Sequence, residues 1–217
     1  MMTKKGGRRT LFSVLAVASI APLAAVPPLQ RPTESPQAVL ERAIDDFLAG
    51  RVVESVVGFD RVVTLAPDAA PQLWQRGIAL YYVGRYDDCR RQFESHRTVN
   101  PNDVENPAWH FLCVARADSP ARAREALLPV GPDQRSPMRE IYRMFKGELA
   151  PDAVLAAGPD GAARFYAELY VGLYYDAIGN KAGALTHLKI AASDRFASAG
   201  GYMHRVARLH PLLGGNP

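Results

Sequence analysis

The chain's two cysteines and five histidines are the side chains most able to do chemistry, and His110 precedes Cys113 by three residues. A nucleophilic cysteine needs a general base and surroundings that stabilise its thiolate. Residues three apart share one face of a helix, so the pair could in principle meet. That face is apolar, and we therefore expect His110 and Cys113 to pack in a core rather than to catalyse.

The segment 104–160 is the other candidate for catalysis. A small helical hydrolase would use His110, Glu140 and Arg143 as groups converging in a closed pocket, and this stays open as an alternative. The sequence has no HExxH, GxSxG or CxxC motif and no phosphate-binding Walker loop. We therefore expect a protein that is not an enzyme, with no catalytic residue, no cofactor and no metal site.

The two cysteines also bear on the compartment of the protein. Cys89 occupies a position where a packed helix needs a small residue, and Cys113 lies in the next predicted helix. In an oxidising compartment the two thiols could form a disulfide, whereas a free cysteine also serves as a small buried hydrophobe. The sequence leaves this choice open.

Aromatic residues are dense in the predicted helices, and several arginines lie near them. Half-exposed tyrosine and tryptophan beside arginine are typical of binding surfaces, although most such rings pack between helices. Arginine forks could bind a carboxylate of a peptide. The candidate partner-binding residues are Trp74, Arg76, Tyr81, Tyr82, Arg85, Trp109, Arg139, Arg143, Tyr170 and Tyr174. The same aromatic cluster includes Tyr142, Phe165, Tyr166 and Tyr175.

A repeat of 34 residues should position these side chains. The pairs at this spacing are Ala43 and Gly77, Gly50 and Gly84, Phe59 and Phe93, and Pro67 and Pro101. Small residues allow two helices to approach closely, glycine suits the turn between them, and proline ends the second helix. This period is the length of a tetratricopeptide repeat.

The remaining chain predicts more helices. Gly172 and Gly179 repeat the small-residue and turn-glycine spacing, and a serine or asparagine before proline signals helix starts at Pro36, at 107–117, at 120–128 and at 137–146. Another helix should start near Asp152, and Gly200–Leu209 should cap the last repeat. We expect an all-α, right-handed superhelical stack over 36–211, with repeats near 36–69, 70–103 and 165–198 and irregular helices over 104–164.

Two resemblances follow from these motifs. Arg76–Tyr82 with Gly84, the segment starting at Pro101, and Tyr170–Tyr175 with Gly179 resemble NlpI-type periplasmic tetratricopeptide proteins. The chain also resembles uncharacterised tetratricopeptide-like proteins of bacteria and plastids across nearly all of 36–209. The first resemblance implies an adaptor that brings an envelope hydrolase to a protease, although the lipid-anchor cysteine of that family is missing here.

The N-terminus predicts export. A basic start is followed by an apolar run that Pro22 interrupts, which is the pattern of a cleaved signal over 1–25 or an uncleaved anchor, and Arg8-Arg9 also fits a twin-arginine signal. A proline-rich flexible leader should occupy 26–35.

Four basic residues in the first nine account for the whole net charge of +4, because 26 basic residues less these four equal the 22 acidic ones. Nucleic-acid binding is therefore not expected.

We expect, from the sequence, a periplasmic or similarly extracytoplasmic adaptor or scaffold that binds a protein or peptide on the concave face of its first helices. Two alternatives to this adaptor stay open. One is the hydrolase described above, and the other is a purely structural scaffold that self-associates, for example as a homodimer. Contact with a membrane is expected only through an uncleaved N-terminal segment.

Overall fold

The computed structural model describes residues 1–2 and 34–211. The chain divides into two units, Met1–Thr33 and Glu34–Pro217, and only the second is described in detail here. The predicted signal over 1–25 and most of the predicted leader over 26–35 therefore lie outside the described residues. Within the described residues, no helix is long and apolar enough to cross a membrane.

Residues 34–211 are all-helical, without a strand. The α-helices are α1 (Pro36–Leu48), α2 (Val52–Leu65), α3 (Trp74–Tyr82), α4 (Tyr86–His96), α5 (Glu105–Ala117), α6 (Pro120–Glu125), α7 (Met138–Lys146), α8 (Pro151–Ala157), α9 (Gly161–Ala177), α10 (Lys181–Ala191) and α11 (Ala197–Leu209). Two short 3-10 helices cover Pro67–Gln72 and Asp194–Phe196. Neighbours in sequence pack together, above all α1 with α2, α3 with α4, α4 with α5, and α9 with α10. This confirms the all-α class and is consistent with a helical stack.

All four helices that the start signals predict are present and begin within two residues of the predicted positions, and two of the four signals cap their helix. Ser35 Oγ accepts a hydrogen bond from the backbone N–H of Ala38 at 3.1 Å, and Ser119 caps α6 in the same way. The other two residues do not cap their helices. Ser136 does not cap α7, because its hydroxyl donates to the carbonyl of Ala157. Asn106 lies inside the first turn of α5, which begins one residue earlier, at Glu105.

The glycines spaced 34 residues apart have the roles that their spacing predicts. Gly50 and Gly84 have φ of 83° and 76° in the turns after α1 and α3, a conformation that side chains with a Cβ disfavour. Gly77 lies where α3 meets α4, and a Cβ there would be 2.6 Å from the ring of Phe93. Two helical pairs thus use equivalent residues for the turn and for close approach.

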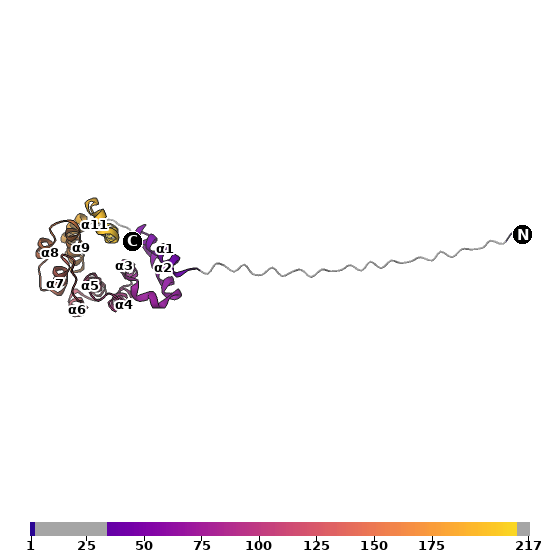
Figure 1. Cartoon of the computed structure of the whole chain (residues 1–217), viewed down its shortest axis with the longest axis horizontal. Helices are drawn as coiled ribbons and strands as arrows, with labels where there is room; N and C mark the ends of the chain where they lie inside the picture. Colours follow the sequence, from indigo (N-terminus) through magenta and orange to yellow (C-terminus); the bar gives the residue numbers. More distant parts are fainter. Residues whose placement is uncertain (3–33, 212–217) are drawn as a thin grey trace. The chain divides into compact units, whose positions relative to one another are not determined.

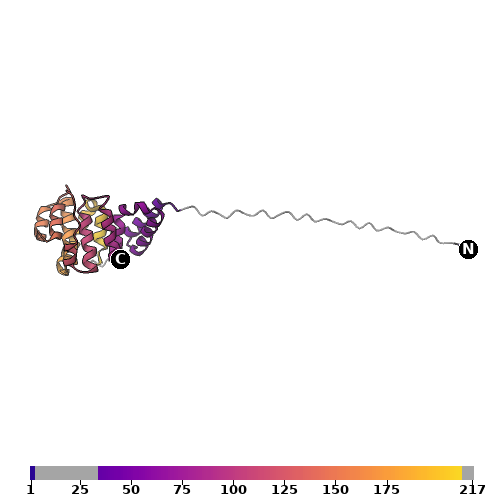
Figure 2. The same ribbon diagram turned by 90° about the horizontal axis from the view of Figure 1, so that it is seen from below.

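The last helix does more than the predicted capping. It spans Ala197–Leu209 with a kink at Gly201, and it contacts α1 as well as α9 and α10. Arg205 Nε donates to the carbonyl of Leu48 at 2.5 Å, across 157 residues of sequence. In Figure 1 the helices follow one another around the unit, and α11 returns toward α1 and α3. Figure 2, turned by 90°, shows the N-terminal helices at one end of the unit and the yellow C-terminal segment among its middle helices.

Candidate functional site

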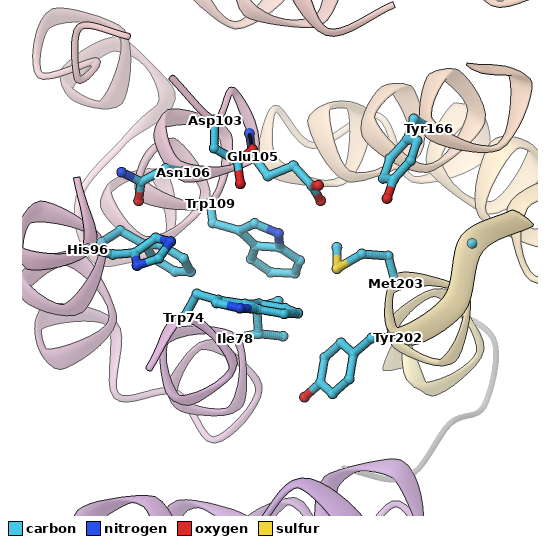
Figure 3. Close-up of a pocket in the computed structure, with 12 residues that line it drawn as sticks. Trp74, Ile78, His96, Asp103, Glu105, Asn106, Trp109, Tyr166, Tyr202 and Met203 are labelled. Carbon is cyan, nitrogen blue, oxygen red and sulfur yellow. Dashed lines mark hydrogen bonds between the residues drawn. The ribbon is translucent and has the colours of Figure 1, made fainter. Parts of the chain in front are cut away.

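A cavity of about 310 Å³ lies between α3, α4, α5, α9 and α11 (Figure 3). Its aromatic walls are Trp74 of α3, Trp109 of α5, Tyr166 of α9 and Tyr202 of α11. The sequence contains only two tryptophans, and both line this cavity. Cavities with apolar walls and a few polar groups are the usual form of a small binding site, so this is the candidate site.

The aromatic walls are held by ring contacts. Trp74 meets Tyr202 edge to face, with ring centroids 5.0 Å apart, and Tyr202 stacks on Phe47 of α1 at 5.4 Å. Trp109 stacks on Phe93 at 6.4 Å and is 1% exposed. Such contacts restrict the orientation of each ring, so the walls are positioned before any ligand arrives.

Two carboxylates, Asp103 and Glu105, form one end of the cavity. Both accept hydrogen bonds from the guanidinium of Arg135, at 2.5 and 2.8 Å respectively. Glu105 also accepts a hydrogen bond from the hydroxyl of Tyr170 at 2.6 Å. Burial raises the pKa of Glu105, and the neighbouring Asp103 carboxylate raises it further. Burial, with a smaller effect of the Glu105 charge, raises the pKa of Tyr166 to about 12.

Two polar atoms of the cavity residues are buried without a hydrogen-bond partner in the described part of the chain. They are the indole Nε1 of Trp109 and the hydroxyl oxygen of Tyr202. Leaving a buried donor unpaired costs roughly 1–3 kcal/mol, and native proteins contain few such groups. A ligand with a hydrogen-bond acceptor could satisfy either donor.

The structure brings together only part of the predicted site. Trp74 and Trp109 line the cavity, whereas Tyr81 and Tyr82 are buried and contact Trp109 from the core, with centroids 5.5 and 6.3 Å away. Tyr170 is fully buried and reaches the site through its bond to Glu105. The partly buried Tyr174 is placed elsewhere, beside Arg124.

The four predicted arginines bind carboxylates of the chain itself. Arg76 and Arg85 both pair with Asp60, at 2.7 and 2.6 Å. Arg139 pairs with Glu140 at 3.0 Å and Arg143 with Glu148 at 3.7 Å. None of the four lines the cavity at Trp74, although Arg139 lines a separate cleft beside Tyr142.

Sequence reasoning missed Asp103, Glu105, Tyr202 and Met203 as cavity residues. Asp103 and Glu105 belong to the segment that follows Pro101, which was interpreted only as a repeat signature. Tyr202 and Met203 lie on the helix expected to cap the last repeat. One sequence signal could have identified the two carboxylates. Asp103 and Glu105 are two residues apart at a helix start, and Trp109 follows Glu105 by four residues.

The residues of the hydrolase alternative have separate partners. His110 Nε2 lies 3.5 Å from Glu94, while Glu140 and Arg143 pair with Arg139 and Glu148. No contact in the described residues joins any two of His110, Glu140 and Arg143. No group of three or more histidine, cysteine, aspartate or glutamate residues that could hold a metal occurs in the described residues.

Cys89 and Cys113 form a disulfide between α4 and α5. This resolves the choice that the sequence left open between a disulfide and two free buried cysteines. Cys113 therefore has no free thiol beside His110. A structural disulfide is compatible with an oxidising location outside the cytoplasm.

No protein-family model matches this sequence, and no curated protein matches it either.

Proposed function

We propose that this protein is an exported adaptor of the tetratricopeptide type, which binds a polypeptide partner through the aromatic cavity on the inner side of its helical stack. The observation that carries the proposal is the convergence of Trp74, Trp109, Tyr166 and Tyr202 on one cavity with two unpaired donors. Aromatic residues around a desolvated pocket are the usual energetic centre of protein recognition.

Other observations support the class and the location. The 34-residue spacing of Gly50 and Gly84 coincides with equivalent turns of two helical pairs. The basic residues concentrated before an apolar run favour export, and the disulfide is compatible with it. The last helix contributes to the cavity and also contacts the first, since α11 supplies Tyr202 and Met203 and packs against α1. The partner surface therefore centres on the cavity beside α11 rather than on the whole row of first helices.

Photo-crosslinking in the native compartment tests the proposal. A benzophenone amino acid would replace Tyr166 at the cavity, and Glu125, whose side chain is 63% exposed on α6, would be the matched control position. We expect a crosslink to another polypeptide from position 166 and none from position 125. Excess unlabelled protein should compete for the crosslink. Equal labelling from both positions, or none from 166 in a folded variant, would contradict the proposed binding face.

A further inference from the structure

We propose that the cavity binds a primary alkylammonium group, presented as the lysine side chain of the polypeptide partner. This rests on the proposed function and adds the chemistry of the group that is recognised. Three features of the described residues carry it: the excess of negative charge at one end, the aromatic walls, and the unpaired donors.

The end of the cavity at α5 has more negative than positive charge. Asp103 and Glu105 line this end and both bind the guanidinium of Arg135, which also binds Asp133 outside the cavity, so three carboxylates share one cation. The Glu105 side chain is 16% exposed, and the Tyr170 hydroxyl donates a hydrogen bond to its carboxylate. A second cation entering this end would therefore be attracted, whereas an anionic ligand would be repelled.

The walls suit a cation as well as an alkyl chain. Tryptophan and tyrosine faces attract ammonium and guanidinium groups within about 6 Å of their centroid. The chain already shows this contact, because the Arg135 guanidinium carbon lies 5.9 Å from the ring centroid of Tyr166. Trp74 and Trp109 also line the cavity (Figure 3) and offer apolar area to the methylene groups of a lysine.

The unpaired donors favour a ligand that also contains an oxygen acceptor. Trp109 Nε1 can only donate, and the Asp103 and Glu105 carboxylates can only accept when ionised. A lysine residue within a peptide supplies both partners, since its ammonium donates and its backbone carbonyl accepts. The volume of about 310 Å³ matches one side chain with its peptide group rather than a folded segment.

Intrinsic tryptophan emission tests this inference, because both tryptophans line the cavity. The full chain would be titrated with Nα-acetyl-lysine amide, with the neutral Nα-acetyl-norleucine amide of similar shape, and with n-butylammonium as a free amine. We expect a saturable change with the lysine probe, and affinities weaker by about tenfold or more for the two others. Glu105→Gln should weaken lysine binding, while Glu125→Gln, on the exposed surface of α6, should leave it unchanged.

Salt provides a readout that needs no variant. The apparent Kd for the lysine probe should rise with sodium chloride in the wild-type chain, because part of the attraction is between charges. If the norleucine probe binds as tightly as lysine, or the lysine probe never saturates, ammonium recognition is wrong. If n-butylammonium binds as tightly as the lysine probe, the cavity takes free amines and the assignment to a polypeptide lysine is wrong.

The two proposals can fail separately. A crosslink from position 166 without lysine binding would retain the partner face and reject its chemistry. Lysine binding without any crosslinked polypeptide would reject the adaptor role and the polypeptide source, leaving a site for small ammonium compounds.

Discussion

Tyr202 of the last helix stacks on Phe47 of the first, with ring centroids 5.4 Å apart and ring planes inclined by 15°. The same tyrosine meets Trp74 of α3 edge to face, so one ring joins both ends of the helical unit to a wall of the cavity. Arg205 of α11 also donates a hydrogen bond to the carbonyl of Leu48, so the helix that supplies Tyr202 to the cavity is bound to the end of α1. The stability of this contact and the shape of the candidate site are therefore linked.

The hydroxyl groups of Tyr202, which lines the cavity, and Tyr170, which lies in the core behind it, should contribute to stability in opposite ways. Tyr202 has a buried hydroxyl without a partner in the described chain, so Tyr202→Phe should leave the free energy of unfolding unchanged or raise it by up to about 1 kcal/mol. Tyr170→Phe, the matched control, removes the bond to Glu105 and should cost roughly 1–3 kcal/mol. Urea unfolding would measure both, and equal losses in the two variants would contradict the hydrogen-bond assignment.

The disulfide between Cys89 and Cys113 should stabilise the fold. It closes a loop with a sequence separation of 24, and the entropy removed from the unfolded chain corresponds to about 3 kcal/mol. The double variant Cys89→Ala/Cys113→Ala should lose about that amount and become insensitive to reductant. Mass spectrometry after alkylation of the unfolded, unreduced chain should find no free thiol, and two alkylated cysteines in protein from an oxidising compartment would contradict the bond.

Close packing at Gly77 should make even one methyl group costly. Gly77→Ala would place a Cβ 2.6 Å from the Phe93 ring, and overpacking of this kind costs about 1–3 kcal/mol, against a gain of up to about 1 kcal/mol in helix propensity. Phe93→Leu on the Gly77→Ala background should recover part of the loss. A double-mutant cycle on thermal or urea unfolding would measure the coupling, and additive effects would contradict the contact.

Acid should destabilise the fold partly through His210. The pKa of His210 is lowered to about 4, mainly by burial. The charge of Asp176 opposes this shift, and the charges of Arg116 and Lys181 add to it. The unfolded chain has a histidine pKa of about 6.5, so it binds the proton first, and stability present above about pH 6.5 is lost as the pH falls toward 4.

The linked loss should be about 3 kcal/mol in the wild-type chain, and His210→Gln should remove this part of the pH dependence. Urea unfolding between about pH 7.5 and pH 4 would compare the two, since the carboxylates titrate in both. The same loss of stability in wild type and variant would show that His210 is not the group responsible.

The glycine turns and the serine caps were predictable, because each depends on the conformation and hydrogen bonds of residues close together in sequence. The turns at Gly50 and Gly84 need a left-handed backbone, and the caps at Ser35 and Ser119 need only their own next residues. The start of α7 was predicted to within one residue, but the capping role of Ser136 was not confirmed. Ser136 points its hydroxyl to Ala157 on another helix, a tertiary contact that no local rule anticipates.

The candidate site was predicted only in part, because it depends on how distant helices meet. Trp74 and Trp109 were chosen for their type and their position on predicted helices, and both line the cavity. Tyr202 was missed, since only the return of α11 to α1 brings it to Phe47 and Trp74. The predicted arginines were expected to bind a partner, but carboxylates such as Asp60 already pair with them.

Fluorine NMR of 5-fluorotryptophan protein is the most direct test of ligand binding between the two tryptophans. The two resonances, from Trp74 and Trp109, would be assigned with a Trp74→Phe variant and followed during addition of Nα-acetyl-lysine amide. We predict that both resonances shift with the same saturation curve, and that Glu105→Gln weakens this response. Resonances that stay in place while the lysine probe binds elsewhere on the chain would contradict the assignment of this cavity as the binding site.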